Sequence, residues 1–432
     1  MQESFAIMPE IIIDKSLTYI EGTQRVFTEE ETLQRVQPLL KYIGVTRIAN
    51  ITDLDRIGIP VFSSIRPSAA EGAISVYSGK GSNETQARIS AIMESFERCL
   101  AERSGVNKDV KEGIASHELI ETPEIASGSH NVIDPHSLLL PEQLMPSSRI
   151  EWTTGWDLLK KEEVLVPTNS VYHPYDAPGM SVKLFRTNTN GLAAGNTIEE
   201  AVFHGLLEVL ERDALSGAEF NRFPGKEIVL TEDDGENFRL MQMCKEKGID
   251  IKLWLLFHDT GVPTVVSALD DVQLKDPALL VMGAGSHLDP SIAVRRAITE
   301  AAQSRVVQIH GAREDTEREK VVRDIGYDRI KRMNRYWYEE GEKVNLSDIK
   351  DLSTDRPSSN ISLLLEKIGN VSERAVVVDL SRESIGVPVV RVIVPTFELY
   401  TIDRERMGSR IKNSPRKKLP AEERPWKRRM VR

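Results

Sequence analysis

The stretch "AAGNTIEEAVFHGLLEVLER", residues 193–212, places polar side chains at regular intervals on what is otherwise an apolar helix. The polar positions recur every three or four residues: Glu200, His204, Glu208 and Glu211. At roughly 100° per residue, these positions fall within a stripe about 80° wide. The flanking alanine, valine, leucine and phenylalanine are residue types that proteins bury. The sequence therefore predicts a buried helix that carries a narrow acidic seam.

The same pattern occurs three times along the chain. "GKGSNETQARISAIMESFER" (79–98) aligns with 193–212 without a gap: Gly81 on Gly195, Ala87 on Ala201, Ser90 on His204, Glu94 on Glu208, Glu97 on Glu211 and Arg98 on Arg212. The helix expected over 290–311 continues the frame in weaker form, with Arg296 on Ser90, Glu300 on Glu94 and Gln303 on Glu97. The chain thus contains three units, each a loop of small residues that leads into a helix with a polar seam.

The paired carboxylates indicate a metal and phosphate site. If the first two helices face one cavity, Glu200 and the two pairs of glutamates repel one another unless cations compensate. Arg98 and Arg212 supply only two charges, and Mg²⁺ is the usual ion that joins carboxylates to phosphate oxygens. A glycine-containing turn before a helix exposes N–H groups to phosphate, and Lys80 adds a charge there, although the P-loop spacing is absent. The alternative is that these acids lie on solvated helix faces.

Composition excludes several other classes of protein. The 432 residues are 40% hydrophobic and 28% charged, and no apolar run reaches the ~18 residues that cross a membrane. The N-terminus lacks the features of a signal peptide, and two cysteines suit a reducing compartment, so we expect a cytoplasmic protein without a membrane segment. The net charge is −10, yet residues 404–432 hold twelve Lys and Arg against three Glu. This tail is either a solvated extension or a docking segment for an acidic protein or nucleic acid.

Strands and helices alternate without a regular βαβ rhythm, which favours an α+β fold of mixed sheets with packed helices. We divide the chain into an N-terminal α/β part (1–75), a core (76–403) that includes a charged insertion at about 311–372, and the basic, proline-containing tail (404–432).

At these motifs the sequence resembles the YcaO family. The family's Ser-x3-Glu-x2-Glu-Arg motif is similar to Ser90, Glu94, Glu97 and Arg98, and its second motif is matched at Glu200, Glu208, Glu211 and Arg212. Ala193 and His204 depart from that motif, which has serine and glutamine there. The family's N-terminal basic residue and following hydroxyl resemble Arg25 and Thr32, and Arg296 lies on a helix similar to one in the family.

The resemblance implies a YcaO-like fold around a nucleotide site that binds ATP and Mg²⁺. It implies catalytic roles for Glu94, Glu97, Glu208, Glu211 and Arg212. It implies Mg²⁺ ligands at Glu94, Glu97, Glu200, Glu208 and Glu211. It implies ATP contacts from Arg25, Thr32, Lys80, Ser90, Arg98, Asn196, His204, Arg212 and Arg296.

The implied reaction is ATP-dependent activation of a peptide backbone amide. The sequence looks most like the stand-alone archaeal branch of the family, which is associated with a TfuA-type partner. This branch implies thioglycine formation with sulfide in the alpha subunit of methyl-coenzyme M reductase, by a homodimer. An azoline-forming cyclodehydratase is the alternative product class. A dinuclear metal enzyme is disfavoured because no helix has the Glu-x-x-His pair, and a nucleotide-binding adaptor whose basic tail binds nucleic acid is the non-enzymatic alternative.

Overall fold

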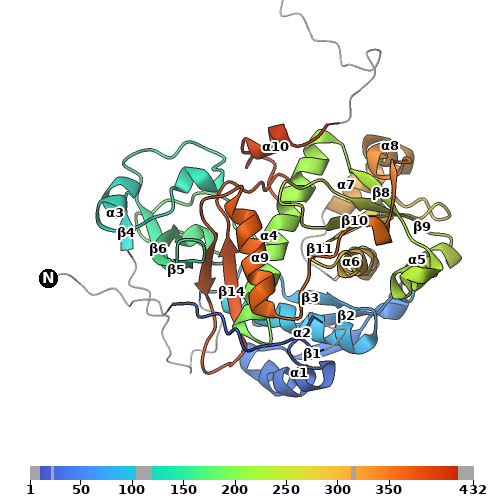
Figure 1. Ribbon diagram of the computed structural model, residues 1–432, viewed down its shortest axis with the longest axis horizontal. Coiled ribbons are helices and arrows are strands. Elements are labelled where there is room, and N and C mark those ends of the chain that lie inside the picture. Colours follow the sequence, from blue (N-terminus) through green and yellow to red (C-terminus); the bar gives the residue numbers. More distant parts are fainter. Residues whose placement is uncertain (1–9, 21–23, 104–118, 313–317, 417–432) are drawn as a thin grey trace, which may run out of the picture.

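The computed structural model describes residues 10–20, 24–103, 119–312 and 318–416, and they build three β-sheets with helices between them (Figure 1). The three-stranded sheet has the order β1-β2-β3: Arg47–Asn50, Val61–Ile65 and Val76–Lys80. The six-stranded sheet has the order β4-β5-β13-β14-β7, with β6 paired to β5: Leu119–Glu121, Ile150–Asp157, Val376–Asp379, Val389–Ile393, Leu192–Ala194 and, for β6, Glu162–Pro167. The five-stranded sheet has the order β11-β10-β9-β8-β12: Val281–Ser286, Thr264–Asp270, Asp250–Leu255, Lys226–Val229 and Lys343–Asn345.

The strand pairs within these sheets are antiparallel, except that β12 runs parallel to β8. The α-helices are α1 Glu29–Val36, α2 Glu84–Ala101, α3 Pro123–Ser129, α4 Ile198–Asn221, α5 Glu236–Glu246, α6 Pro290–His310, α7 Arg318–Ile325, α8 Tyr327–Met333, α9 Pro357–Gly369 and α10 Arg410–Asn413. The α+β class with mixed sheets is therefore confirmed.

The three repeat units are arranged in a ring. Each unit is an edge strand followed by a long helix: β3 and α2, β7 and α4, β11 and α6. Each helix packs against its own sheet and against the edge strand of the next unit, because α2 contacts β7, α4 contacts β11 and α6 contacts β3. Figure 1 shows α4 passing through the middle of the molecule between the two larger sheets. The sheets on either side of each helix therefore fix the direction in which its polar seam faces.

The units begin in the same way. The N-caps of the three helices are Asn83, Thr197 and Asp289, which occupy one position of the repeat. In each case the side chain accepts a hydrogen bond from a backbone N–H in the first turn, so the sequence frame fixes where each helix starts.

Glycine lets strand and helix backbones approach closely in these units. A Cβ at Gly79 would lie 1.9 Å from the Ala91 nitrogen and 2.4 Å from the Ala87 oxygen. Gly285 occupies the same repeat position and is equally close to the Ala293 oxygen. Packing therefore requires these glycines. This structural reason for glycine stands beside the phosphate binding expected of the glycine-containing turns.

Some segments differ from what the sequence pattern predicts. The pattern of residues 28–44 predicts one continuous helix. In the structure, α1 begins at a capping box on Thr28 but gives way to a 3₁₀-helix, Gln37–Ile43, since Pro38 lacks the N–H that an α-helix needs. Within the range 311–372, α9 is apolar and packs against α4 in the core. The structure describes residues 404–416 of the basic tail, and within them α10 packs against α4. The rest of the tail, 417–432, lies outside the described residues.

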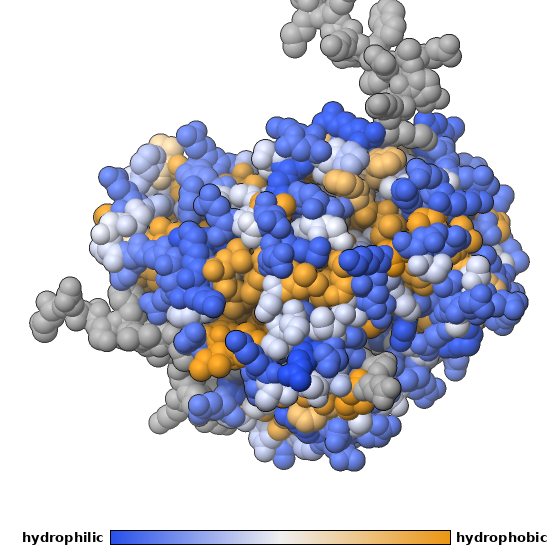
Figure 2. Space-filling model, viewed as in Figure 1, coloured by the Kyte–Doolittle hydropathy of each residue, from blue (hydrophilic) through white to orange (hydrophobic). Residues whose placement is uncertain are grey.

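The surface in the view of Figure 2 is largely hydrophilic, with apolar side chains gathered across the middle of this face over α9. Among the described helices, each is too short or too polar to cross a bilayer.

Replacing Gly79 by alanine should destabilise the fold, because the new methyl group meets backbone atoms of α2 that no side-chain rotation can move. We expect the variant to lose about 3 kcal/mol of unfolding free energy, measured by denaturant titration. The matched control is Gly128→Ala in α3, where a Cβ meets no atom of the described residues within 4 Å and helix propensity improves. Equal stability of the two variants would contradict the packing role of Gly79.

Candidate nucleotide and metal site

The acidic seams of α2 and α4 lie face to face. Glu97 on α2 accepts a hydrogen bond of 2.9 Å from the backbone nitrogen of Ala194, at the end of the strand that leads into α4. Burial raises the pKa of Glu97 well above its usual value, and Glu94 and Glu208 raise it further. A carboxylate from each helix therefore contributes to one shared negative field.

Glu208 is the carboxylate on α4 that faces Glu97. Burial raises its pKa to about 7, Arg212 opposes this shift, and Glu211 and Glu94 add to it. Glu211 is almost fully buried and accepts a hydrogen bond of 3.0 Å from the Ser286 nitrogen. Arg212 lies 3.7 Å from Glu211, and the surrounding carboxylates raise its pKa although burial acts against them.

The hydrogen bonds of Glu97 and Glu211 are one contact repeated around the ring. Each side chain reaches from its helix to the last strand residue of the next unit, Ala194 or Ser286, and these residues are equivalent in the repeat. The third unit makes a related contact with the direction reversed: the Gln303 amide donates to the Ser78 carbonyl on β3, two residues before Lys80, which is the equivalent of Ala194 and Ser286. These contacts fix how the three helices are placed about the site.

The third unit also supplies a carboxylate that the sequence analysis did not include in the site. Glu300 aligns with Glu94 and Glu208, and it forms an ion pair with Lys80. Burial alone would raise the pKa of Glu300, but Lys80 and Arg212 lower it overall. The alignment of Glu300 with Glu94 and Glu208 in the repeat is the sequence signal that could have identified this residue. Lys80, expected to contact phosphate, is held by this pair at the edge of the site.

The other end of the site is basic. Arg296 lies 3.1 Å from the Nε2 atom of His204. Burial lowers the pKa of His204 well below its usual value, and Arg296, Arg25 and Lys80 lower it further, so His204 is neutral. His287, a second residue that sequence reasoning missed, has its pKa lowered to about 3 by burial and by the same two arginines.

Glu200 ties the N-terminal segment to this basic end. One carboxylate oxygen accepts a 2.7 Å hydrogen bond from the Val26 nitrogen, and the other accepts from the backbone and side chain of Asn196, each at 3.1 Å. Because N–H donors use both oxygens, Glu200 holds the Arg25 segment beside α4. Of the other expected contacts, Thr32 is buried on α1, which packs against α2, and Ser90 lies one turn before Glu94. Within the described part of the chain, no hydrogen bond or ion pair ties Thr32 or Ser90 to the carboxylates.

The arrangement fits a phosphate chain with a divalent cation. The Glu94 and Arg98 side chains keep 29% and 19% of their exposure, so solvent reaches the seam, and Arg98 bonds Glu94 at 2.7 Å. A raised pKa shows that the negative charge of a carboxylate is poorly compensated by its surroundings. A hard cation such as Mg²⁺ would supply the missing positive charge. The cluster of Arg25, His204 and Arg296 offers donors and positive charge to phosphate oxygens.

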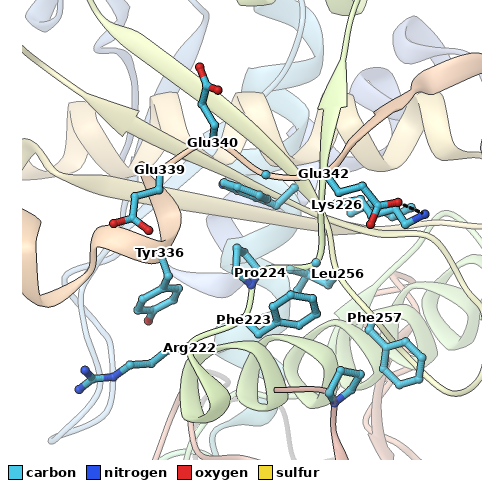
Figure 3. Close-up of a pocket in the computed structure, with 15 residues that line it drawn as sticks. Arg222, Phe223, Pro224, Lys226, Leu256, Phe257, Tyr336, Glu339, Glu340 and Glu342 are labelled. Atoms are coloured by element: carbon cyan, nitrogen blue, oxygen red, sulfur yellow. Dashed lines mark ion pairs between the residues drawn. The ribbon is translucent and has the colours of Figure 1, made fainter. Parts of the chain in front are cut away.

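Two other features lie apart from this site. A cavity of about 430 Å³ is lined by Arg222, Phe223, Trp254, Tyr336 and neighbouring residues beyond the C-terminal end of α4, about 20 Å along the helix from Glu208 (Figure 3). Asp213, His258 and Asp259 cluster closely, but Arg410 bonds both aspartates and occupies the position that a cation would take.

Comparison with known proteins identifies similar chains. The family described as YcaO cyclodehydratase, ATP- and Mg²⁺-binding, matches residues 78–398. A protein of Methanothermobacter thermautotrophicus is 49% identical over 387 residues, 89% of this chain and 97% of that protein. The YcaO protein of Methanopyrus kandleri, solved bound with AMPPCP and Mg²⁺, is 30% identical with a TM-score of 0.72, covering 90% of this chain and 97% of that one. A protein in the tfuA 3′ region of Rhizobium leguminosarum bv. trifolii is 28% identical over 394 residues, 87% of this chain and 89% of that protein.

Replacing Glu208 by glutamine should stabilise the metal-free protein at high pH. The folded state keeps the Glu208 proton up to about pH 7, whereas the unfolded chain releases it near pH 4.5, so the wild type loses stability as pH rises through this window. At pH 8 we expect the variant to exceed the wild type by on the order of 2 kcal/mol, and at pH 4 we expect the two to converge. Thermal unfolding in EDTA at both pH values measures the difference.

The control is Glu383→Gln, because Glu383 is exposed. This control should not change stability at either pH. A Glu208→Gln variant that is less stable than the wild type at pH 8 would show that the carboxylates do not repel one another as described.

Proposed function

The chain belongs to the YcaO family, and on this premise we propose that it activates a peptide backbone amide with ATP and Mg²⁺ and converts the amide to a thioamide. The observation that supports the proposal most directly is the raised pKa of Glu97 and Glu208, whose carboxylates face one another from α2 and α4. A site that buries like charges in this way is built for a bound cation.

The chain's own residues divide the work of binding. Glu94, Glu97, Glu200, Glu208 and Glu211 would hold Mg²⁺. Glu200 would also keep the Arg25 segment in place. Arg25, Arg296, His204 and Asn196 would bind phosphate oxygens at the basic end, and Arg98 and Arg212 would balance charge between the two ends. Lys80, Ser90 and Thr32 complete the expected nucleotide contacts from the first unit and α1.

The nucleotide supplies a phosphoryl group that turns the amide oxygen into a leaving group, because oxide leaves poorly from carbon and phosphate leaves well. Arginines that are already in place stabilise the negative charge that develops without having to reorganise. The overall reaction is amide + HS⁻ + ATP giving thioamide + ADP + hydrogen phosphate. The amide oxygen ends on the phosphate, together with the proton that sulfur loses.

The relatives support the choice of product that we propose. The chain is similar over nearly its whole length to proteins of Methanothermobacter and Methanopyrus, which are archaea, and the Rhizobium relative lies beside tfuA. We therefore propose a homodimer that modifies a glycine in the alpha subunit of methyl-coenzyme M reductase, with a TfuA-type partner or another donor supplying sulfide. The family's description as a cyclodehydratase supports azoline formation as the second candidate.

Mass spectrometry of a peptide product separates these two reactions. Incubation of the protein with ATP, Mg²⁺, sulfide, a TfuA-type partner and a glycine-containing peptide from the reductase should increase peptide mass by the exchange of one oxygen for sulfur. A cysteine-containing peptide should show no loss of water. Glu97→Gln should reduce thioamide formation at least about a hundredfold, because it removes a charged metal ligand.

Reactions that lack ATP or Mg²⁺ serve as controls and should leave the peptide unchanged. Loss of water from the cysteine peptide without oxygen-for-sulfur exchange would establish the cyclodehydratase instead. No change in either peptide with all components present would exclude both.

A further inference from the structure

The Arg25 segment, Gln24–Val26, is held by hydrogen bonds on both sides of the arginine. The Val26 nitrogen donates to Glu200 of α4 at 2.7 Å. The Arg25 carbonyl accepts a hydrogen bond of 2.7 Å from the Ile20 nitrogen. On the other side, the Gln24 side chain contacts residues at the start of α9. The backbone of this exposed arginine is therefore fixed by parts of the chain that lie far away in the sequence.

Gln24 has a backbone conformation that residues with a side chain rarely adopt. Its φ is 54°, in the left-handed region. Such a conformation persists where the surrounding structure holds it, and it is found most often at functional positions. Because Arg25 is the next residue, the contacts that hold Gln24 also set the direction in which the Arg25 side chain leaves the backbone.

Three hydrogen bonds form a closed ring between Gln24, Thr354 and Asn360. Gln24 Nε2 donates to the Thr354 carbonyl at 3.3 Å, the Thr354 nitrogen donates to Asn360 Oδ1 at 2.8 Å, and Asn360 Nδ2 donates to Gln24 Oε1 at 3.1 Å. The Thr354 hydroxyl donates a further bond of 2.9 Å to Asn360 Oδ1. A backbone N–H can only donate, so the Thr354 nitrogen fixes which way the Asn360 amide faces. The Asn360 NH₂ group is thereby directed at Gln24.

Asn360 connects this ring to the core. It is 0% exposed and lies on α9, an otherwise largely apolar helix that packs against α4. A buried amide costs free energy unless its hydrogen-bonding groups are used, and here Thr354 and Gln24 use them. One buried side chain therefore transmits the fixed position of α9 to Gln24.

The rest of the N-terminal region has contacts of its own with the residues before α9. The Tyr19 nitrogen donates to the Asp355 carbonyl at 2.8 Å, and Arg356 Nη1 donates to the Lys15 carbonyl at 3.2 Å. Neither bond involves Asn360. Replacing Asn360 should therefore release Gln24 without detaching the whole N-terminal region.

The charge of Arg25 acts at the basic end of the nucleotide site. Burial and Arg296 lower the pKa values of His204 and His287, and Arg25 lowers both further, so its guanidinium lies within electrostatic reach of the two rings. A guanidinium binds phosphate through donors that point in fixed directions. An arginine on a loosely held segment must lose more conformational freedom when it binds, which weakens the contact.

We propose that Asn360 is a positioning residue for nucleotide binding: acting through Gln24, it holds Arg25 in the orientation in which the guanidinium meets phosphate oxygens. The proposal rests on the role given to Arg25 in the function proposed above. Asn360 is buried under the Arg25 segment, so its effect on the nucleotide passes through Gln24 and Arg25.

Calorimetric titration of the full chain with AMPPCP and Mg²⁺ measures this effect without turnover. Arg25→Ala should raise the Kd at least about tenfold, since it removes a charge-assisted hydrogen bond, and Asn360→Ala should raise it about fivefold. The double variant should match Arg25→Ala within about twofold, because Asn360 then has no arginine to position. A wild-type Kd in Asn360→Ala, or multiplication of the two effects in the double variant, overturns the proposal.

The matched control is Asn221→Ala. Asn221 Nδ2 donates to the carbonyls of Gly217 and Ile411 at 3.1 and 2.9 Å, so this asparagine also joins a helix to a neighbouring segment, at the far end of α4. Asn221→Ala should lower thermal stability as Asn360→Ala does, yet leave the Kd for AMPPCP unchanged. An equal rise of the Kd in both variants would assign the effect to general loss of stability and overturn the proposal.

If Asn360→Ala does not fold, Gln24→Ala removes the same contact from the other partner. It should also raise the Kd about fivefold and should have no further effect in the Arg25→Ala background. In turnover, either variant should raise the KM for ATP by a similar factor and change kcat by no more than about threefold, because the lost contact is one to bound nucleotide.

The outcomes separate this proposal from the proposed function. Wild-type protein that binds AMPPCP but forms no thioamide refutes the proposed reaction, and the Kd values of the variants still decide the role of Asn360. Arg25→Ala protein that binds AMPPCP as tightly as the wild type removes Arg25 from the nucleotide site and overturns the positioning role of Asn360 with it.

Discussion

Mutual repulsion between buried carboxylates on α2 and α4 is the constraint around which the structure is organised. Each helix is packed between two sheets, so Glu97 and Glu208 are kept near one another although both residues are only partly buried. The hydrogen bonds from Ala194 and Ser286 hold Glu97 and Glu211 in place at the cost of stability. Stability is therefore given up at the position where we propose that a cation binds, which is how many functional sites arise.

The three units of the ring are only approximately alike in sequence. The chemistry of the site depends on the positions at which their residues differ. Two units keep the glutamate and arginine of the motif, whereas the third neutralises Glu300 with Lys80 and has Arg296 where the second unit has His204. The site therefore has an acidic side and a basic side rather than three equal ones. A triphosphate with its metal needs this polarity, because its oxygens and its cation require opposite partners.

Much of this could be predicted from the sequence, because the relevant spacing lies within single helices. Glu94 and Glu97, and Glu208 and Glu211, share a face by helix geometry alone, and the ungapped repeat indicated that both pairs belong to one site. The partners of these residues could not be predicted in the same way. Lys80 and Glu300 are 220 residues apart, and only the folded ring brings them together.

Arg391 shows the same limit more clearly. It lies within "VPVVRVIVPTF", a stretch whose pattern predicts a core strand, and nothing local indicates that this residue lines a small cavity beside α4. Likewise, the charged appearance of residues 311–372 concealed α9, because a mean charge over sixty residues does not resolve one apolar helix. In each case the missing information is long-range contact rather than local propensity.

The position of β14 has a consequence for how the protein is made. Among the described strands, β7 pairs only with β14, and β7 is too short to persist without a partner. The hydrogen bond from the Ala194 nitrogen to Glu97 therefore depends on residues 389–393, although these residues lie far from α2 and β7 in the sequence. During synthesis, this contact between the first two units can persist only once the distant segment has been made and has paired with β7.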